Sequence, residues 1–157
     1  MFYRHYVSTL YRNGIHLNAD DKYMTKVIHI NSKEAFNREV IMASDTKAVL
    51  VDFWADWCAP CKAMNPILDQ FAANNPDIKV VKVDTENDGG ISQYYDISSI
   101  PTMLLFMDRG PRSRIIGAKS YGMLESDILG IVRKWKKKAG DNVAAKKGLK
   151  KLFGPGR

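Results

Sequence analysis

The middle of the chain switches between two spacings of hydrophobic residues, and each spacing predicts one kind of element. Short runs of β-branched and other apolar residues predict strands. Apolar residues that recur every three or four positions predict helices with one buried face. Strands are predicted over residues 26–30, 48–53, 78–83, 103–107 and 112–117. Helices are predicted over residues 32–42, 58–74 and 87–95, and a last one extends to residue 135.

This order of elements predicts an α/β fold in which a central mixed sheet of about five strands is flanked by about four helices. The run at residues 48–53 is apolar except for Asp52, which suits a central strand buried on both faces. Residues 108–111, Asp-Arg-Gly-Pro, predict a turn that rests on the glycine and the proline. Pro66 lies inside the second helix and predicts a kink there.

Charge divides the chain into three parts. The net charge is +7, but residues 133–157 hold ten Lys and Arg and one acidic residue. We therefore expect a domain over residues 25–135, mildly acidic over residues 25–132, with an N-terminal extension (residues 1–24) and a basic C-terminal tail (residues 136–157). Two cysteines are too few for a secreted disulfide scaffold. The sequence has no run of about 18 apolar residues, so no membrane span is predicted.

The N-terminal extension has no apolar stretch typical of a secretory signal peptide. Arg4 and Arg12, with hydroxyl residues and no acid before Asp20, leave an organellar presequence open. We favour another interpretation, in which Met24 is the natural start and the residues before it are flexible or foreign to the natural protein.

The basic tail is interpreted as solvated. Gly148 and residues 154–156, Gly-Pro-Gly, argue against a long stable helix. The alternatives are contact with an anionic membrane surface or with nucleic acid. No aromatic-interleaved motif favours nucleic acid, and membrane contact is not favoured either.

The only two cysteines, Cys58 and Cys61, mark the point where the central strand gives way to a helix. A Cys-x-x-Cys pair at such a junction is typical of a dithiol redox site. Cys58 precedes the first helical turn, where free N–H groups and the helix dipole favour a thiolate and predict a lowered pKa. Cys61 lies on the same side of the helix, close enough to attack a mixed disulfide on Cys58. We expect Cys58 to be an exposed nucleophile and Cys61 a more buried resolving thiol.

Two structural roles for the cysteine pair are less favoured. A zinc site needs two further ligands. The three histidines, His5, His16 and His29, have no zinc-motif spacing, so no metal site is predicted. A role as inert core cysteines is also disfavoured, because two tryptophans and Pro60 frame the pair. Pro60 suits an early helix position.

The flanks of the pair carry a resemblance to a known family. Residues 51–55, Val-Asp-Phe-Trp-Ala, and residues 57–62, Trp-Cys-Ala-Pro-Cys-Lys, resemble the thioredoxin family closely, and so do residues 100–102, Ile-Pro-Thr. The resemblance spans residues 25–135, roughly two-thirds of the chain, and implies the thioredoxin fold.

The resemblance also implies roles for residues outside the pair. Asp52 matches the family's proton acceptor and donor for the resolving cysteine, and Lys82 matches the buried lysine that faces it. An exposed strand lysine is the other interpretation of Lys82. Pro101 matches the family's cis-proline beside the dithiol, although an ordinary proline at a strand start also fits.

A substrate groove beside the dithiol is implied as well. Gly117 matches a glycine that leaves this groove open, or it serves a strand-end turn. Ala59 stands where the family most often has glycine, which bears on the reduction potential. Asp96, Ser98 and Ser99 stand where the family commonly has glycine and a basic residue, so the rim carries a different charge. The groove residues implied are Trp57, Ala59, Pro60, Ile100, Pro101 and Gly117.

The resemblance implies a protein-disulfide reductase that binds no cofactor itself and is recharged by a thioredoxin reductase using NADPH. Its partners would be that reductase and disulfide-containing proteins, with no specific nucleic acid. We expect a cytoplasmic monomer, or a protein of the mitochondrial matrix if residues 1–24 are a presequence. The alternatives are a disulfide donor or isomerase in an oxidising compartment, and a redox-inert interaction module anchored by the tail. The missing signal peptide argues against the first, and the intact pair with Asp52 argues against the second.

Overall fold

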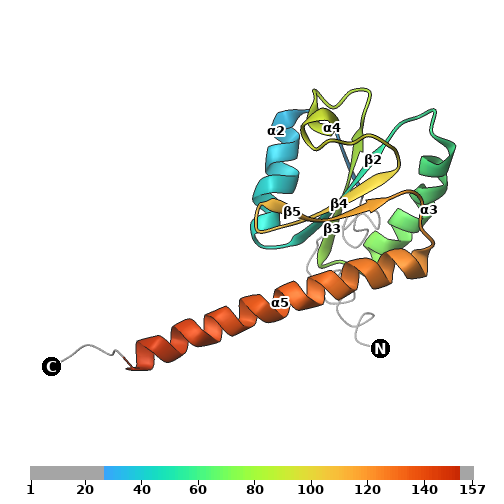
Figure 1. The fold of residues 1–157 in the computed structure, drawn as a ribbon. Helices are drawn as coiled ribbons and strands as arrows, with labels where there is room; N and C mark the ends of the chain where they lie inside the picture. Colours follow the sequence, from blue (N-terminus) through green and yellow to red (C-terminus); the bar gives the residue numbers. More distant parts are fainter. Residues whose placement is uncertain (1–26, 153–157) are drawn as a thin grey trace, which may run out of the picture.

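The computed structural model describes the backbone of residues 27–152 and the side chains of residues 27–141. The predicted N-terminal extension and residues 153–157 of the tail lie outside the described residues. Strands and helices follow in the predicted order (Figure 1). The strands are β1 (Ile28–Ile30), β2 (Ala48–Trp54), β3 (Ile78–Asp84), β4 (Thr102–Met107) and β5 (Gly110–Ile116). The helical segments are α2 (Lys33–Phe36), η1 (Asn37–Met42), η2 (Ala43–Asp45), α3 (Ala59–Asn74), α4 (Ile91–Tyr94) and α5 (Tyr121–Leu152).

The five strands form one mixed sheet in the order β1-β3-β2-β4-β5. β1 and β2 run parallel to β3, whereas β4 is antiparallel to both β2 and β5. β2 is therefore the central strand, and its residues from Ala48 to Phe53 are all buried. The prediction of a central strand covered on both faces is confirmed, because helices lie on either side of the sheet.

Alternate residues along each strand face opposite helical layers. Leu50 of β2 and Met103 of β4 pack with Leu68 of α3 and Leu124 of α5. On the other face, strand residues pack with Phe36 and with side chains of η1 and α4. Asp52 lies two positions after Leu50, so its side chain faces the same layer as α3. The sheet thus directs this carboxyl toward the helix that carries the cysteines.

The helix predicted after β1 is present, but it is not one regular α-helix. Its start is capped by Ser32, whose hydroxyl accepts a hydrogen bond from the Ala35 N–H at 3.2 Å. The chain then continues through a π-helical turn, η1, and ends in a 3₁₀ turn, η2. Phe36 and Val40 remain buried on one face. Apolar spacing predicted that face correctly, but it does not determine the backbone hydrogen-bond register.

The helix predicted over residues 87–95 is shorter than expected, because α4 covers only Ile91–Tyr94. Gly89 and Gly90 adopt φ angles of 66° and 93°, which favour glycine and interrupt helical geometry. The Asp88 carboxylate accepts hydrogen bonds from the N–H groups of the residues that follow, Gly90, Ile91 and Ser92. These bonds satisfy the free N–H groups at the start of the helix and define where it begins.

The hairpin turn between β4 and β5 is tighter than predicted. Asp108 and Arg109 form it with φ angles of 49° and 61°, so Gly110 and Pro111 already belong to β5. Two successive left-handed residues give a turn whose twist matches that of the paired strands. The Asp108 N–H donates to the Ser44 carbonyl at 2.8 Å, and Arg109 contacts the Asp45 carboxylate at 2.6 Å. Contacts with η2 therefore hold the turn in place of the expected glycine and proline.

Helix α5 continues well beyond the sheet (Figure 1). Its 32 residues span about 48 Å at 1.5 Å per residue. The expectation that Gly148 prevents a long helix is wrong, because the backbone is helical to Leu152. Alanine and lysine, both good helix formers, dominate this stretch.

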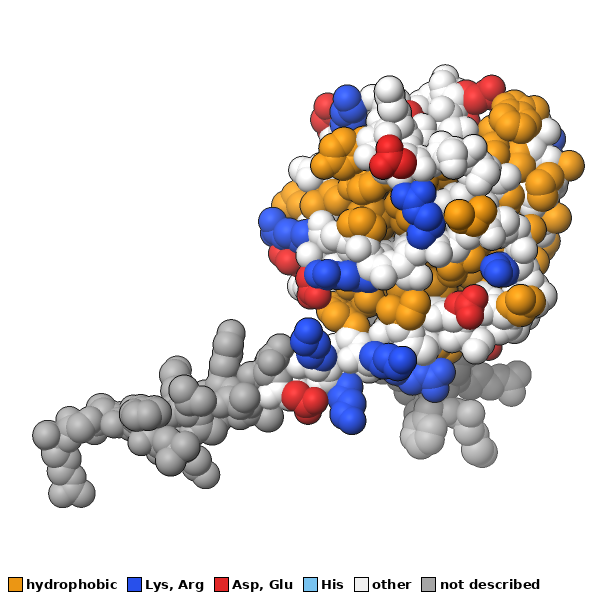
Figure 2. Space-filling model, in the orientation of Figure 1, with side chains coloured by type: hydrophobic (Ala, Val, Ile, Leu, Met, Phe, Trp, Pro, Cys, Tyr) orange, Lys and Arg blue, Asp and Glu red, His pale blue; other side chains and the backbone are white. Residues whose placement is uncertain are grey.

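The start of the tail and the residues just before it are strongly basic. Arg133, Lys134 and residues 136–138 are exposed, and Figure 2 shows basic side chains gathered where α5 leaves the domain. Lys136 pairs with Asp77 at 3.0 Å. Among the residues that the structure describes, none of the helices combines the length and apolar character needed to cross a membrane.

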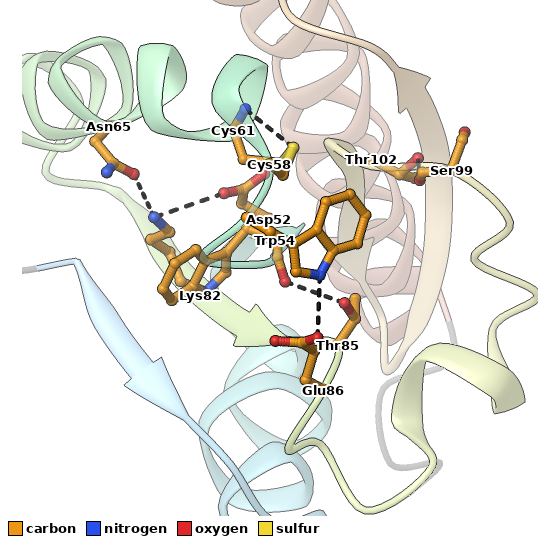
Figure 3. The surroundings of a disulfide bond; sticks show 11 residues. Asp52, Trp54, Cys58, Cys61, Asn65, Lys82, Thr85, Glu86, Ser99 and Thr102 are labelled. Atoms are coloured by element: carbon orange, nitrogen blue, oxygen red, sulfur yellow. Dashed lines mark hydrogen bonds and ion pairs between the residues drawn. A yellow bond between two sulfur atoms is a disulfide. The ribbon is translucent and has the colours of Figure 1, made fainter.

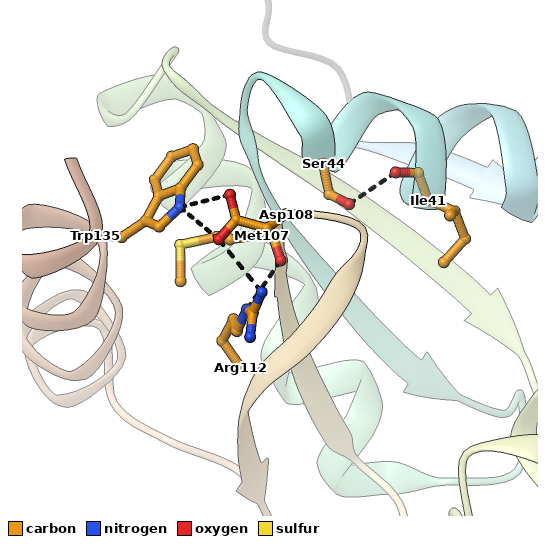
Figure 4. A network of polar contacts seen from close by, with 6 residues as sticks. All are labelled: Ile41, Ser44, Met107, Asp108, Arg112 and Trp135. Carbon is orange, nitrogen blue, oxygen red and sulfur yellow. Dashed lines mark hydrogen bonds and ion pairs between the residues drawn. The ribbon is translucent and has the colours of Figure 1, made fainter. Parts of the chain in front are cut away.

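Trp135 attaches α5 to the hairpin turn. Its indole N–H donates to both oxygens of the Asp108 carboxylate, at 3.1 and 3.0 Å (Figure 4). Arg112 approaches the same carboxylate at 3.3 Å and donates to the Met107 carbonyl. The Trp135 ring also packs against the core between the sheet and the α3 and α5 layer. The turn and the helix thus share one polar contact network.

Candidate active site

Cys58 is the N-cap residue of α3, and the helix places both cysteines at its first turn. The Cys58 backbone is extended, and its sulfur accepts a hydrogen bond from the Cys61 N–H at 3.2 Å. The two sulfurs are joined in a disulfide, with the Cα atoms 5.3 Å apart (Figure 3). Pro60 lies in the first turn of the helix, where a missing N–H is tolerated. The structure therefore brings the two predicted cysteines together in their oxidised state.

Cys58 is less accessible than the sequence predicts. Only 3% of its surface is exposed, against 0% for Cys61. The predicted order of burial holds, but the expectation of an exposed Cys58 is wrong for the disulfide form. The reason is that its sulfur is bonded to Cys61, while Ala55, Trp54 and Ile100 pack around the pair.

The loop that precedes β4 lies against the disulfide. Its Ile100–Pro101 peptide bond is cis, as the resemblance implied. The Thr102 hydroxyl donates to the Ser99 carbonyl at 2.7 Å, and the Gly117 N–H donates to the Pro101 carbonyl at 2.8 Å. These two bonds fix the loop to the ends of β4 and β5.

Gly117 lies directly after β5, next to the cis-proline loop. Its φ of +84° is a left-handed conformation that favours glycine at the end of a strand. A Cβ atom built there would meet no atom of the described residues within 4 Å, so this position also borders open space. The glycine thus shapes the backbone next to Pro101 without being packed against a neighbour.

The predicted rim residues Trp57, Ala59 and Pro60 are all exposed around the disulfide. Trp57 is 70% exposed, and its indole N–H donates to the Glu86 carboxylate at 3.0 Å. Glu86 is the second residue after β3, so the turn beyond that strand orients the tryptophan. An exposed apolar ring held by one hydrogen bond is suited to contact a protein partner.

Asp96, one of the loop residues that depart from the family's usual pattern, has a left-handed backbone with φ of 51°. Aspartate tolerates this conformation better than most residues. Arg114 donates to the carbonyls of Tyr95 and Asp96 at 2.6 and 2.9 Å, which holds the loop before the cis-proline. Asp96 therefore places an acidic residue near the site, in a loop whose backbone carbonyls are held by Arg114.

Asp52 is fully buried beneath the cysteine pair. Figure 3 shows its carboxyl pointing toward the cysteines, with Lys82 approaching from the other side. Within the described residues, neither carboxyl oxygen accepts a hydrogen bond. Burial raises the pKa of Asp52 from 3.8 to about 6, and the positive charge of Lys82 opposes this shift.

Lys82 is also buried, with 4% of its surface exposed. This settles the choice between a buried and an exposed strand lysine. Its ammonium lies 4.0 Å from an Asp52 oxygen and 4.3 Å from the centroid of the Trp54 ring. Burial lowers the pKa of Lys82, whereas the carboxylates of Asp52, Asp69 and Asp56 oppose the shift. Burial therefore drives the lysine and Asp52 toward their neutral forms.

Asn65 is the site residue that sequence reasoning missed. Its side-chain oxygen accepts a hydrogen bond from the Lys82 ammonium (Figure 3). Asn65 lies in α3 four positions after Cys61, so both side chains emerge on the same side of the helix. The only signal in the sequence was a polar residue one turn beyond the second cysteine. That signal does not reveal the partner, because Lys82 lies on a strand, far away in the chain.

A pocket of about 420 Å³ opens on the Lys82 side of the site. His29 lies at its wall and meets the Trp54 ring edge-on at 6.0 Å. Burial lowers the pKa of His29, and the charge of Lys82 adds to this effect. His5 and His16, the other histidines considered as zinc ligands, lie outside the described residues. The pocket walls are formed by Val27, His29, Trp54, Asp56, Lys62, Asn65, Leu68, Asp69 and Lys82.

Disulfide exchange is the chemistry that these contacts serve, and the fold and site define the class of protein-disulfide oxidoreductases. Within that class the chain belongs to the thioredoxin family, whose family model matches residues 26–129. A thioredoxin of Mycolicibacterium smegmatis is 43% identical over 98 residues, which cover 60% of this chain and 86% of that protein. The crystal structure of thioredoxin from Trypanosoma brucei brucei superposes with a TM-score of 0.63 at 27% identity, covering 76% of this chain and 99% of that one.

A third relative joins two proteins in one chain. The bifunctional thioredoxin reductase/thioredoxin of Mycobacterium leprae is 40% identical over 90 residues, which cover 57% of this chain and 20% of that protein. The predicted family, fold and disulfide chemistry of the present chain are thereby confirmed.

Proposed function

We propose that this oxidoreductase reduces protein disulfides, with Cys58 as the nucleophile and Cys61 as the resolving thiol. The observation that carries the proposal is the hydrogen bond from the Cys61 N–H to the Cys58 sulfur at 3.2 Å. In the reduced protein the same N–H and the helix dipole would stabilise a Cys58 thiolate. Cys61 is fully buried, which favours the neutral thiol until a base removes its proton.

The reaction consists of two exchange steps. The Cys58 thiolate attacks one sulfur of the substrate disulfide, so a Cys58–substrate bond forms and the substrate bond breaks. The released substrate thiolate takes a proton from water. Cys61 then gives its proton to Asp52 and attacks the Cys58 sulfur, which closes the Cys58–Cys61 disulfide and releases the second substrate sulfur. Two electrons pass from the dithiol to the substrate.

Asp52 is suited to receive the Cys61 proton. A base works best when its pKa lies near the working pH, and the pKa of Asp52 is about 6. Both of its oxygens lack hydrogen bonds within the described residues, so a lone pair is available. Lys82, at 4.0 Å, stabilises the ionised form that can accept a proton.

Substrate contacts are assigned to the exposed rim and the cis-proline loop. The residues concerned are Trp57, Ala59, Pro60, Ile100, Pro101 and Gly117. Trp57 supplies a large apolar surface that is already oriented by Glu86. The open space beside Gly117 leaves room for an extended chain to approach Pro101. These features support a protein disulfide rather than a small-molecule disulfide as substrate.

The oxidised pair needs an electron donor, and we assign this role to a thioredoxin reductase that uses NADPH. The Mycobacterium leprae relative, with both names in one chain, supports that pairing. The present chain would act as a monomer, bind no cofactor of its own and have no specific nucleic-acid partner. Its basic tail would be solvated rather than bound to a membrane. A reducing compartment follows from this direction of electron flow, namely the cytoplasm, or the mitochondrial matrix if residues 1–24 are a presequence.

The reduction potential of the Cys58–Cys61 pair tests the direction of the reaction. We expect a value well below the cytosolic glutathione poise of about −220 to −260 mV. A value clearly above that range would overturn the proposal and favour a disulfide donor. Cys61→Ser should trap one substrate molecule as a mixed disulfide on Cys58, whereas Cys58→Ser should trap none. Trapping by Cys58→Ser instead would reverse the assigned roles.

A further inference from the structure

Asn65 is the described side chain that accepts a direct hydrogen bond from the Lys82 ammonium. It is half-buried on α3, the helix that also carries Cys61. The other close neighbours of the ammonium are the Trp54 ring and the more distant Asp52 carboxyl. An amide oxygen satisfies one donor of the ammonium without adding a charge, so Asn65 can hold Lys82 without itself titrating.

Besides Asp52, two other carboxylates lie near the Lys82 ammonium and could attract it. Asp69 of α3 and Asp56 of the loop before α3 both act on its charge and both line the pocket beside it. The two other ionisable groups at the pocket are His29 of β1, whose Cα is the register partner of Lys82, and Lys62 of α3. The pocket of about 420 Å³ leaves space for the ammonium to move away from the cysteines. Something must therefore keep it beside Asp52.

We propose that Asn65 is a positioning residue that holds the Lys82 ammonium beside Asp52 and thereby keeps that carboxyl ready to receive the Cys61 proton. The inference rests on the proposed role of Asp52. It identifies a link that runs from α3 through β3 to β2. The helix that carries the resolving cysteine thereby also influences Asp52, the base that receives its proton. Asn65 does not touch the reacting sulfurs and acts only through Lys82.

The direction of the effect follows from charge. Without the Asn65 oxygen, the ammonium turns toward the pocket, where water, Asp56 and Asp69 stabilise it. Asp52 then loses part of a nearby positive charge, and its pKa rises. At neutral pH more of the carboxyl is protonated and unable to accept a proton, so closure of the Cys58–Cys61 disulfide slows and its pH profile moves to higher pH.

The test follows the Asp52 carboxyl directly in the oxidised protein, where the cysteines do not titrate. A ¹³C NMR titration of that carboxyl in the full chain is compared for wild type, Asn65→Leu, Lys82→Met and the double variant. Asn65→Leu keeps the size of the side chain and removes the acceptor. We expect an upward shift of the Asp52 midpoint in Asn65→Leu, a larger one in Lys82→Met of about one unit or more, and no further shift in the double variant.

Gln70→Ala is the matched control, because Gln70 is exposed on the same helix and should leave the midpoint unchanged. Equal midpoints in wild type and Asn65→Leu would overturn the inference. So would an Asn65→Leu shift of the same size with and without Lys82, since Asn65 would then not act through the lysine.

Asp52→Asn separates this inference from the proposed function. If that variant closes the disulfide at the wild-type rate, the proposed role of Asp52 fails whatever Asn65 does. If Asp52→Asn slows closure but Asn65→Leu leaves the Asp52 midpoint in place, only the inference about Asn65 fails. Slowed closure in Asp52→Asn together with the expected midpoint shifts would support both.

Discussion

The ammonium of Lys82 lies 4.0 Å from the carboxyl of Asp52, and the two residues are register partners on neighbouring parallel strands. Both are almost completely removed from solvent. The attraction between two buried charges offsets little of the free energy needed to remove them from water. This holds particularly when the carboxyl has no hydrogen bond within the described residues. The pair is therefore better explained by proton transfer than by stability.

The first prediction concerns the stability cost of Asp52. Its pKa is raised from 3.8 to about 6 in the folded protein. A raised folded-state pKa means that stability is fully present below pH 3.8 and is lost as the pH rises through about 6. At 1.36 kcal/mol per pKa unit, the loss amounts to about 3 kcal/mol at neutral pH. Asp52→Asn should therefore make the oxidised protein more stable by about that amount at pH 7, with little gain below pH 4.

Urea unfolding at several pH values would measure this difference. Asp127→Asn is the control, because Asp127 is exposed on α5 and should change stability by less than about 0.5 kcal/mol. An Asp52→Asn variant that is less stable than wild type at pH 7 would show that the carboxyl is held by favourable contacts.

The second prediction concerns Trp57, which is 70% exposed and held by Glu86. Trp57→Ala should lower kcat/KM for a protein disulfide by roughly tenfold, about 1.4 kcal/mol, since it removes an exposed aromatic anchor. Reduction of a small aromatic disulfide should change less, because the small probe makes fewer rim contacts. Tyr94→Ala removes another exposed ring, on α4, and serves as the control. Equal losses for both variants would argue against a specific role of Trp57.

The third prediction concerns the contact between Trp135 and Asp108. Trp135→Phe keeps most of the ring but removes the N–H that donates to both carboxylate oxygens. We expect a loss of about 1 kcal/mol in the free energy of unfolding. Asp108→Asn retains an acceptor and tolerates the left-handed backbone, so its effect should be smaller. Denaturant unfolding checks both, and a larger loss in Asp108→Asn would mean that the Arg112 contact dominates.

The fourth prediction concerns Gly117, whose φ is +84°. Gly117→Ala should destabilise the protein by about 1 kcal/mol or more through backbone strain, although open space surrounds the position. Gly110→Ala is the matched comparison, because Gly110 has no positive φ and also has free space around it. That variant should be neutral or slightly stabilising. If the two variants have the same effect on thermal unfolding, backbone conformation is not what requires glycine at residue 117.

The sequence determined the features that depend on neighbours along the chain. Apolar spacing predicted the order of strands and helices, including the central strand at residues 48–53. The Cys58–Cys61 spacing at a strand-to-helix junction predicted a redox pair, because a helix start both exposes N–H groups and brings such residues together. The burial of Asp52 could be predicted as well, since it lies within an apolar run.

Tertiary structure decided the features that depend on partners far away in the chain. The Asn65–Lys82 bond joins a helix to a strand, and neither residue's local pattern indicates it. The turn at Asp108 and Arg109 is fixed by η2 and α5, so its residues need not be the usual turn formers. The low exposure of Cys58 comes partly from its bond to Cys61 and partly from Ile100, which lies in a distant loop. In each case the deciding contacts are hydrogen bonds, ion pairs or packing between separate elements, which hydrophobic spacing along one segment does not record.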